Sequence, residues 1–373
     1  MTQPSIAVAG TGAFAGALVR ALARHPQPLS LHVLSSDARR AADLAELGRD
    51  HAALTGAPPT CTAHRVNIGH PGELDRLLAK VRADALVVCT SEHSPAERTT
   101  APSAWTALLA EAGFGLTLPL QATHVLRYGQ ACRRVTPDTM LVNACFPDAV
   151  NPVLAALGTP VTCGLGNVAT LAAVLAARLD LVGQRPLQLL AHHAHLHTPA
   201  SPADEARAWL DGEGTDLTRH LASLRRRDRA HLNEVGAAAA AAPLAALVGA
   251  GPTHHGHLPA PAGLPGGYPV TVRHRRVDLR LPPGVTRSEA IAWNTERGRL
   301  DGAAVDSDGT VRLEEPALAA LRRHWPDAPG QWSATDLTWL RDDLLRLRDR
   351  LRSLPVPAPA GPSPEPSLQG VAP

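Results

Sequence analysis

Aromatic side chains and lysine are scarce in this sequence. Phe, Trp and Tyr make up 3% of its 373 residues, which leaves little material on which nucleic-acid bases could stack. Lys80 is the only lysine, and a net charge of +2 provides no excess of cations for a phosphate backbone. The sequence therefore predicts no nucleic-acid partner.

Paired cysteines and long apolar runs are missing as well. The five cysteines are odd in number and form no Cys-x-x-Cys spacing, so neither a disulfide framework nor a zinc ribbon is indicated. No window reaches the roughly 18 uninterrupted apolar residues of a membrane span, and the N-terminus does not resemble a secretory signal. We therefore expect a cytoplasmic protein with no membrane partner.

What the sequence does contain, through its first half, is an alternation of short apolar runs and helical patterns. Such alternation is typical of a parallel sheet with helices on both faces. It predicts an α/β fold with a doubly wound Rossmann sheet. The expected strands are Ser5–Ala9, Leu29–Leu34, Ala85–Cys89, Met140–Asn143 and Val161–Gly164, and the expected helices are Ala13–Arg24, Ala38–Leu47, Glu73–Val81, Leu120–Val135 and Asp148–Leu157.

The length predicts more than one domain, because single cores rarely grow beyond roughly 250 residues. We expect a dinucleotide-binding domain over residues 1–165, an α+β substrate domain over 166–353, and a disordered Pro-rich tail over 354–373. In the second domain Pro186–His197 is expected as a strand and Tyr268–Leu281 as a strand or hairpin. A final amphipathic helix begins at a Ser333/Asp336 capping pair and carries one stripe of leucines, Leu337, Leu340, Leu344, Leu347 and Leu351.

A glycine turn follows the first predicted strand and opens the first helix. It has the G-x-G-x-x-A pattern, in which backbone N–H groups and the helix dipole meet a pyrophosphate. The alternative is a tight turn without a ligand. The expected cofactor-binding residues here are Gly10, Thr11, Gly12, Ala13, Phe14 and Ala15.

The end of the second strand bears on which dinucleotide is bound. NAD-binding proteins usually place an acid there for the ribose hydroxyls, whereas this sequence has Ser35, followed by Arg39 and Arg40. A hydroxyl and two guanidinium groups suit a 2′-phosphate, so NADP is expected in preference to NAD. Two alternatives stay open: Asp37 could serve NAD, and the arginines could simply solvate a helix face.

From Met140 the sequence reads MLVNACFPDAVNPVLAALGTPVTCGLGN. This stretch, with the glycine turn, resembles the superfamily of the lactate/malate dehydrogenases and the NAD-dependent family 4 glycosidases over roughly residues 5–200. The resemblance implies that Asn143 lies beside nicotinamide or substrate. It also implies that Arg98 clamps a substrate carboxylate and that His193 is either an acid/base residue or a metal ligand.

Two positions depart from that pattern. The dehydrogenases' aspartate and arginine would fall near Thr170 and Ala173, and the glycosidases' metal-binding cysteine would fall at Gly166. The sequence therefore offers His193 no carboxylate partner. If Pro186–His197 is a strand, His193, His195 and His197 share one face, where they could bind a divalent metal, with His254, His255 and His257 on a loop above them. Solvated histidines are the alternative.

These observations favour an NAD(P)-dependent oxidoreductase acting on a small-molecule or peptide-borne substrate, with His193, Asn143 and Arg98 as the expected catalytic residues. Two rival hypotheses stay open. One is a metal-using, redox-assisted lyase or hydrolase like the glycosidases. The other is a nucleotide-binding protein that has lost its chemistry, because a fold does not imply a function. The protein could also form a homo-oligomer.

Overall fold

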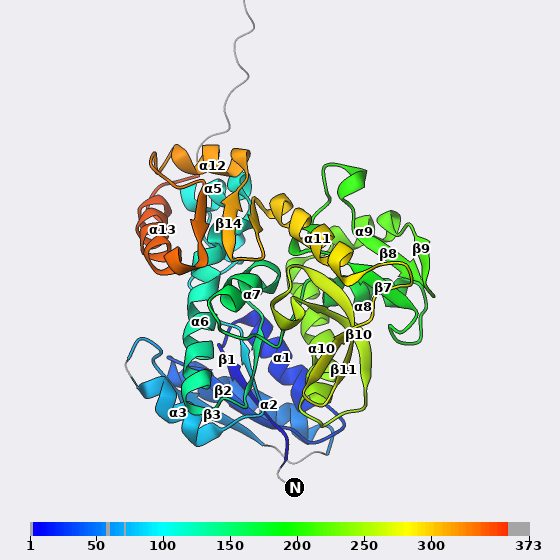
Figure 1. Cartoon of the computed structure of the whole chain (residues 1–373). Coiled ribbons are helices and arrows are strands. Elements are labelled where there is room, and N and C mark those ends of the chain that lie inside the picture. The colour runs from blue at the N-terminus through cyan, green and yellow to red at the C-terminus, as the bar shows by residue number, and fades with distance from the viewer. Residues whose placement is uncertain (1–2, 57–59, 71, 357–373) are drawn as a thin grey trace, which may run out of the picture.

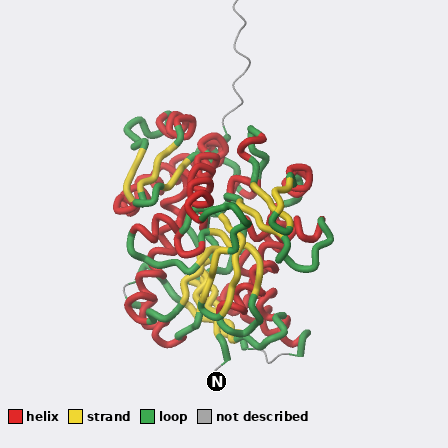
Figure 2. Tube along the Cα trace, turned by 45° about the vertical axis from the view of Figure 1, so that its right-hand side comes forward, coloured by secondary structure: helices red, strands yellow, loops and turns green. Residues whose placement is uncertain are grey.

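The computed structural model describes residues 3–56, 60–70 and 72–356. Most of the tail that was predicted to be disordered, residues 357–373, lies outside this part of the chain. Figure 1 shows the elements in order along the chain, and Figure 2 shows strands gathered in the middle of the molecule with helices around them.

The predicted doubly wound sheet is confirmed. Six parallel strands lie in the order β3-β2-β1-β4-β5-β6, with the chain reversing direction across the sheet between β1 and β4. Sequence analysis missed β3, because its Cys-Thr-Ala-His-Arg sequence is mostly polar and only half-buried. The strands are β1 Ser5–Ala9, β2 Ser30–Ser35, β3 Cys61–Arg65, β4 Ala85–Val88, β5 Met140–Asn143 and β6 Cys163–Gly164.

Helices connect these strands and cover both faces of the sheet. Most begin within two residues of the predicted position, whereas α4 and α5 were not predicted. The helices of the first half are α1 Ala13–Ala23, α2 Ala38–Ala53, α3 Glu73–Val81, α4 Glu97–Thr100, α5 Ala104–Ala112, η1 Phe114–Thr117, α6 Leu118–Val135 and α7 Pro147–Ala156.

The second half contains helices and three small antiparallel sheets, as expected of an α+β region. Its strands are β7 Leu187–Leu190, β8 Arg207–Leu210, β9 Glu213–Thr215, β10 His254–Pro259, β11 Gly267–Arg273, β12 Arg276–Leu279, β13 Ala303–Val305, β14 Thr310–Leu313 and β15 Gln331–Ser333. Its helices are α8 Val168–Arg178, η2 His193–Leu196, η3 Pro202–Asp204, α9 Thr218–Arg225, α10 Arg229–Leu247, η4 Pro261–Gly263, α11 Arg287–Gly298, η5 Arg299–Asp301, α12 Glu315–Arg322, η6 Ala334–Asp336 and α13 Leu337–Arg352.

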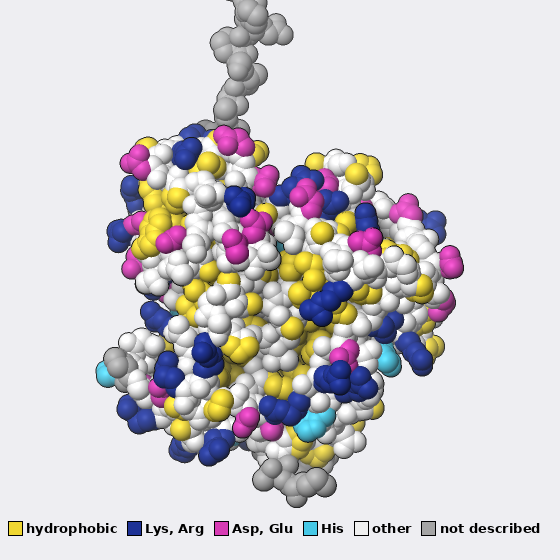
Figure 3. All heavy atoms as spheres, viewed as in Figure 1, with side chains coloured by type: hydrophobic (Ala, Val, Ile, Leu, Met, Phe, Trp, Pro, Cys, Tyr) yellow, Lys and Arg dark blue, Asp and Glu magenta, His cyan; other side chains and the backbone are white. Residues whose placement is uncertain are grey.

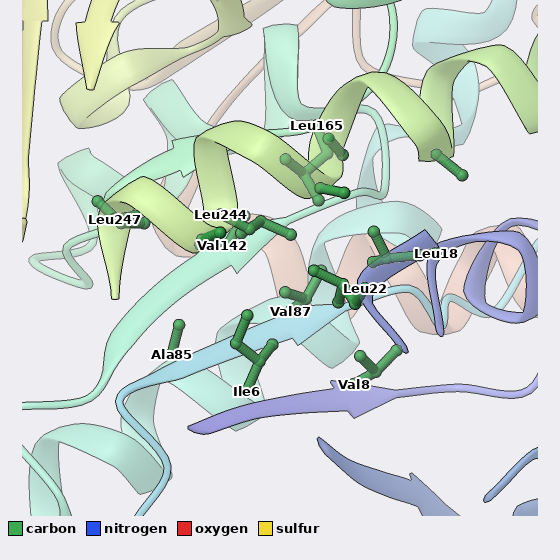
Figure 4. Packing of buried hydrophobic residues seen from close by; sticks show 14 of the residues in the cluster. Ile6, Val8, Leu18, Leu22, Ala85, Val87, Val142, Leu165, Leu244 and Leu247 are labelled. Atoms are coloured by element: carbon green, nitrogen blue, oxygen red, sulfur yellow. The ribbon is translucent and has the colours of Figure 1, made fainter. Parts of the chain in front are cut away.

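Both halves contribute to the cores on the two faces of the large sheet. On one face, Ile6 and Val8 of β1 and Leu18 of α1 form a core with Leu244 and Leu247 of α10 (Figure 4). Burial of such side chains contributes about 1.5–3 kcal/mol each. The boundary expected at residue 165 stays a prediction, but α10 returns across it to pack on α1.

The final helix has the predicted amphipathic form. Ser333 N–H donates to Asp336 Oδ2 at 2.9 Å, which caps the turn that leads into α13. All five leucines of the predicted stripe are buried, and Leu337 and Leu340 pack into the core that contains α6. Within the residues that the structure describes, no helix is long and apolar enough to cross a membrane.

The predicted strand Pro186–His197 is wrong in its second part. β7 ends at Leu190, and His193 to Leu196 form the 3₁₀ turn η2 instead. The histidines at 193, 195 and 197 therefore do not share one strand face. The second histidine cluster also differs from expectation, because His254, His255 and His257 lie on strand β10 rather than on a loop.

Candidate active site

A crevice of about 840 Å³ opens at the carboxyl ends of the large sheet's strands. Its walls include the segments that follow β1 to β6, together with residues of α8, η2 and α10. In doubly wound folds this edge, at the reversal of strand order, is where ligands bind. On the face of the molecule shown in Figure 3, basic and acidic side chains are spread over the surface, and hydrophobic side chains are most frequent near the middle of the view.

The glycine turn forms one end of the crevice. Gly10 has φ +119°, and a Cβ at this position would lie 2.9 Å from the carbonyl oxygen of Cys89, so the turn needs glycine. Gly12 precedes α1, which has no side-chain cap and no acid in its first turn. The first N–H groups of α1 can therefore meet an anion. Ala15 is buried and packs in the core under α1 instead of lining the crevice.

The segment after β2 lies beside the glycine turn. Ser35, Asp37 and Arg40 line the crevice. Asp37 caps α2 by accepting hydrogen bonds from the backbone N–H groups of Arg39, at 3.0 Å, and Arg40, at 3.1 Å. Arg39 is not among the residues that line the crevice, and 91% of its side chain is exposed. Of the two arginines singled out in the sequence, the fold brings only Arg40 to the expected cofactor site.

His193 lies at the other end of the crevice and has a carboxylate partner after all. Its Nδ1 lies 2.9 Å from Oδ1 of Asp301, which is 108 residues further along the chain. Asp301 is buried in η5, and its other oxygen, Oδ2, lies 3.0 Å from Nδ1 of His192. Since an ionised carboxylate only accepts hydrogen bonds, both Nδ1 atoms donate. This leaves Nε2 of His193 unprotonated when the ring is neutral.

The two histidines keep Asp301 ionised. Burial by itself would raise its pKa, but the neighbouring His193 and His192 outweigh burial and hold the pKa of Asp301 well below its usual range. Burial likewise opposes the charged form of His192, yet its bond to Asp301 and the nearby Asp148 raise the pKa of His192. The sequence contains no local signal for this arrangement, because its members come from segments far apart in the chain.

Two glycines allow the Asp301 segment to reach the site. Gly113, with φ +88°, and Gly302, with φ +86°, lie where the Asp301 turn packs against the end of α5. A Cβ on Gly113 would overlap the backbone of Asp301, and one on Gly302 would overlap the carbonyl oxygen of Ala112. The close approach of these two backbones therefore requires glycine on both sides.

Phenylalanine rings enclose His193. Phe114 is stacked on the imidazole with ring centroids 4.9 Å apart, and Phe146 meets it edge-on at 5.0 Å. Phe146 has φ +48°, which is unusual for a bulky residue, and Asn167 has φ +44°. Strained backbone of this kind persists only where its surroundings hold it, and it is concentrated at functional sites. Asn167 also lines the crevice and donates from Nδ2 to Asp148.

Asn143 is close to the site but is used to hold the backbone. Its Oδ1 accepts the N–H of Cys145 at 2.7 Å, and its Nδ2 donates to the carbonyl oxygen of Cys145 and to Oδ1 of Asn151. The side chain is completely buried and is not among the residues that line the crevice. Its expected catalytic and cofactor-binding roles stay predictions, and in this structure it shapes the turn after β5.

Arg98 and Arg229 occupy different positions relative to the crevice. Arg98 is exposed on α4 and does not line it, whereas Arg229, the first residue of α10, does. Within the described parts of the chain, no carboxylate lies within ion-pair distance of Arg229. The Arg229 side chain is exposed, and the partial burial of its guanidinium lowers its pKa. Arg229 is thus one of three arginines that line the crevice, with Arg40 and Arg127, and it can bind an anionic ligand.

His195 and His257, one from each cluster, make hydrogen bonds to the protein backbone. Nδ1 of His195 accepts the N–H of His192 at 2.7 Å, and its Nε2 donates to the carbonyl oxygen of Asp204. Burial lowers the pKa of His195 to about 4 and that of His257 to about 3. Among residues 3–56, 60–70 and 72–356, no group of three or more His, Cys, Asp or Glu side chains is arranged to hold a metal ion.

Comparison with known proteins shows which known fold this chain has. No protein-family model matches this sequence, and no curated protein is similar to it in sequence. The structure, however, is similar to malate dehydrogenase from Picrophilus torridus, with 11% identity, 88% of this chain and 100% of that chain covered, and a TM-score of 0.53. Malate dehydrogenase from Salinibacter ruber matches with 14% identity, coverage of 87% and 99%, and a TM-score of 0.52.

A lactate dehydrogenase from Eimeria maxima, solved with NADH and oxamate, is 12% identical, with 81% of this chain and 96% of that chain covered and a TM-score of 0.50. At such low identity these likenesses describe the fold alone. The chain has the fold of the malate and lactate dehydrogenases, which confirms, for the fold, the resemblance seen in the segment from Met140 to Asn167.

Proposed function

We propose that this protein is an NAD(P)-dependent oxidoreductase in which His193 exchanges a proton with the substrate. The observation that carries the proposal is that one crevice contains both a glycine turn suited to a pyrophosphate and a histidine held by a buried carboxylate. A nicotinamide cofactor is also in keeping with the dehydrogenase fold. When bound, it supplies or accepts the hydride.

The chain's own residues would handle the proton. With Nδ1 of His193 donating to Asp301, Nε2 can accept the proton of a substrate hydroxyl during oxidation and return it to the oxygen during reduction. Asp301 stabilises the imidazolium that forms and keeps the ring in one tautomer. Phe114 and Phe146 exclude water from two sides of the ring. Arg229 would bind an anionic group of the small-molecule or peptide-borne substrate.

We further propose that NADP is preferred to NAD. Ser35 and Arg40 line the crevice where a 2′-phosphate would lie, and the carboxylate of Asp37 already caps α2 and faces Arg40. The cap leaves this carboxylate less available to the ribose hydroxyls of NAD.

Calorimetry with NADP and NAD tests the cofactor site. Gly12→Asp places a negative charge at the glycine turn and should abolish dinucleotide binding, whereas Ala53→Asp, which adds the same charge at the exposed far end of α2, should not.

His193→Asn tests the role of the histidine. This variant should retain dinucleotide affinity while losing NADPH-dependent turnover of a panel of 2-oxo acids and ketones. Unchanged binding by Gly12→Asp, or full turnover by His193→Asn, would contradict the proposal.

A further inference from the structure

The chain has three phenylalanines, and all three line the crevice. Phe14 lies on the glycine turn, at the cofactor end. Phe114, at the start of η1, and Phe146, just before α7, lie at the reactive end, where their ring centroids are 4.9 Å apart and both contact His193. In a sequence with so few aromatic residues, this concentration at one site calls for a functional reason.

The surroundings of His193 are also the surroundings of the reacting carbon. A proton can pass to Nε2 only from an oxygen within hydrogen-bond distance of about 2.6–3.2 Å. The groups attached to the reacting carbon must therefore lie against the side chains that surround the imidazole. Phe114 is half-buried and keeps part of its ring open to the crevice, whereas Phe146 is almost fully enclosed.

The walls that η2, α8 and α10 contribute to the crevice are mostly uncharged. Leu196 of η2 and Leu232 of α10 line the crevice. α8 contributes Thr170, and its only charged residue, Arg178, lies at its far end. Among the described residues that line the crevice, the single acid is Asp37, at the opposite end beside the glycine turn. Arg229 is thus the one full positive charge among the lining residues of η2, α8 and α10.

We propose that the substrate carries an apolar group, aryl or branched alkyl, next to its reacting carbon, and that this group packs on Phe114, Leu196 and Leu232. The inference rests on the proposed function for the location of the reacting carbon. Burying such a group gains about 25 cal/mol for each Å² of apolar surface, which a small polar substituent cannot match in these surroundings. Arg229 would then hold the anionic end of the same molecule.

Two probes that differ only in the apolar group test the inference. Dissociation constants of 3-phenyllactate and lactate are measured by ligand-observed NMR, with and without NADP. We expect the wild type to bind 3-phenyllactate at least about tenfold more tightly. Phe114→Ala should remove most of this preference and Phe114→Leu only part of it. Trp339→Ala, which removes an aromatic ring that is 44% exposed on α13, should leave the preference intact.

The outcomes separate the inference from the proposed function. Failure of NADP to bind would contradict the proposed function. The affinities of the two probes can still be compared on the protein without NADP, and that comparison tests the inference. Equal affinity for the two probes in both states would overturn the inference. So would a preference that survives in Phe114→Ala, provided that the circular dichroism and thermal unfolding of this variant match those of the wild type.

Discussion

His192 and His193 are adjacent in the chain and share one carboxylate, each donating from Nδ1 to a different oxygen of Asp301, at 3.0 and 2.9 Å. Adjacent residues on a strand would point to opposite faces, so the sharing depends on the chain leaving β7 and entering η2 at this point. Asp301 thereby obtains a donor for each oxygen, and its orientation toward His193 is determined from both sides.

Replacing the shared carboxylate should separate chemistry from cofactor binding. In Asp301→Asn, the side chain has one acceptor oxygen and one NH₂ donor, so it can no longer accept hydrogen bonds from both histidines, and a carboxylate no longer holds the ring of His193 in one tautomer. We expect turnover to fall about 10–100-fold, the affinity for NADP to stay within a factor of about two, and the free energy of unfolding to fall by about 1–3 kcal/mol. Steady-state kinetics, calorimetry and urea unfolding measure the three quantities. Unchanged turnover would remove Asp301 from the mechanism.

His192 should act by positioning Asp301. His192→Asn keeps a neutral donor close to the position of Nδ1, whereas His192→Ala leaves Oδ2 of Asp301 without a partner. We expect His193 to keep its Nδ1-protonated tautomer in His192→Asn and to populate both tautomers in His192→Ala. Long-range ¹H–¹⁵N spectra of the imidazoles report the tautomer directly. If both variants retain the wild-type spectrum of His193, His192 serves only in packing.

Arginines of α13 should stabilise one wall of the crevice. Arg352 donates to the carboxylate of Glu97, which is almost buried beside His93, and Arg341 donates to that of Glu92. Arg352→Ala leaves Glu97 without its cation and should lower the free energy of unfolding by about 1–3 kcal/mol at pH 7. Arg346→Ala, which removes a partner of Asp343 at the surface, should cost less than about 0.5 kcal/mol.

The effect of Arg352→Ala should depend on pH. Burial by itself would raise the pKa of Glu97, but Arg352 outweighs it and lowers the pKa below the ordinary value of 4.5. Because the pKa is depressed in the folded state, this contribution is fully present above about pH 4.5 and is lost as the pH falls through the folded-state value. The difference in unfolding free energy between wild type and variant should therefore shrink between pH 6 and pH 3. A difference that stays constant over this range would contradict the assignment.

Neighbouring arginines provide a matched test of cofactor preference. Arg40 lines the crevice, whereas Arg39 points into solvent. Arg40→Ala should weaken NADP about tenfold and NAD little, because a phosphate contact of about 1.4 kcal/mol is lost, while Arg39→Ala should change neither affinity. Calorimetry measures the affinities of both variants for NADP and NAD. A wild-type protein that binds NAD as tightly as NADP would contradict the proposed preference.

Local sequence patterns accounted for the elements that depend on neighbouring residues. β1, α3 and β5 have the predicted bounds. An apolar run between turn residues, or an apolar helix face, is formed by residues only a few positions apart, so the local sequence is enough to predict it. The leucine stripe of α13 was predicted for the same reason. Where the pattern was weak the prediction failed. The polar sequence of β3 does not predict a strand, and the alternation after Leu190 predicts one although the chain turns into η2 there.

The sequence by itself therefore determined the doubly wound sheet and the glycine turn at its edge, since each depends on residues close together in the chain. Only the tertiary structure decided that Asp301 is the partner of His193, that Arg40 and not Arg39 reaches the crevice, and that Phe114 and Phe146 enclose the imidazole. The physical reason is that some of these contacts join segments that lie far apart in the chain, and the others depend on which face of a helix is directed toward the crevice. Both are set by packing between elements.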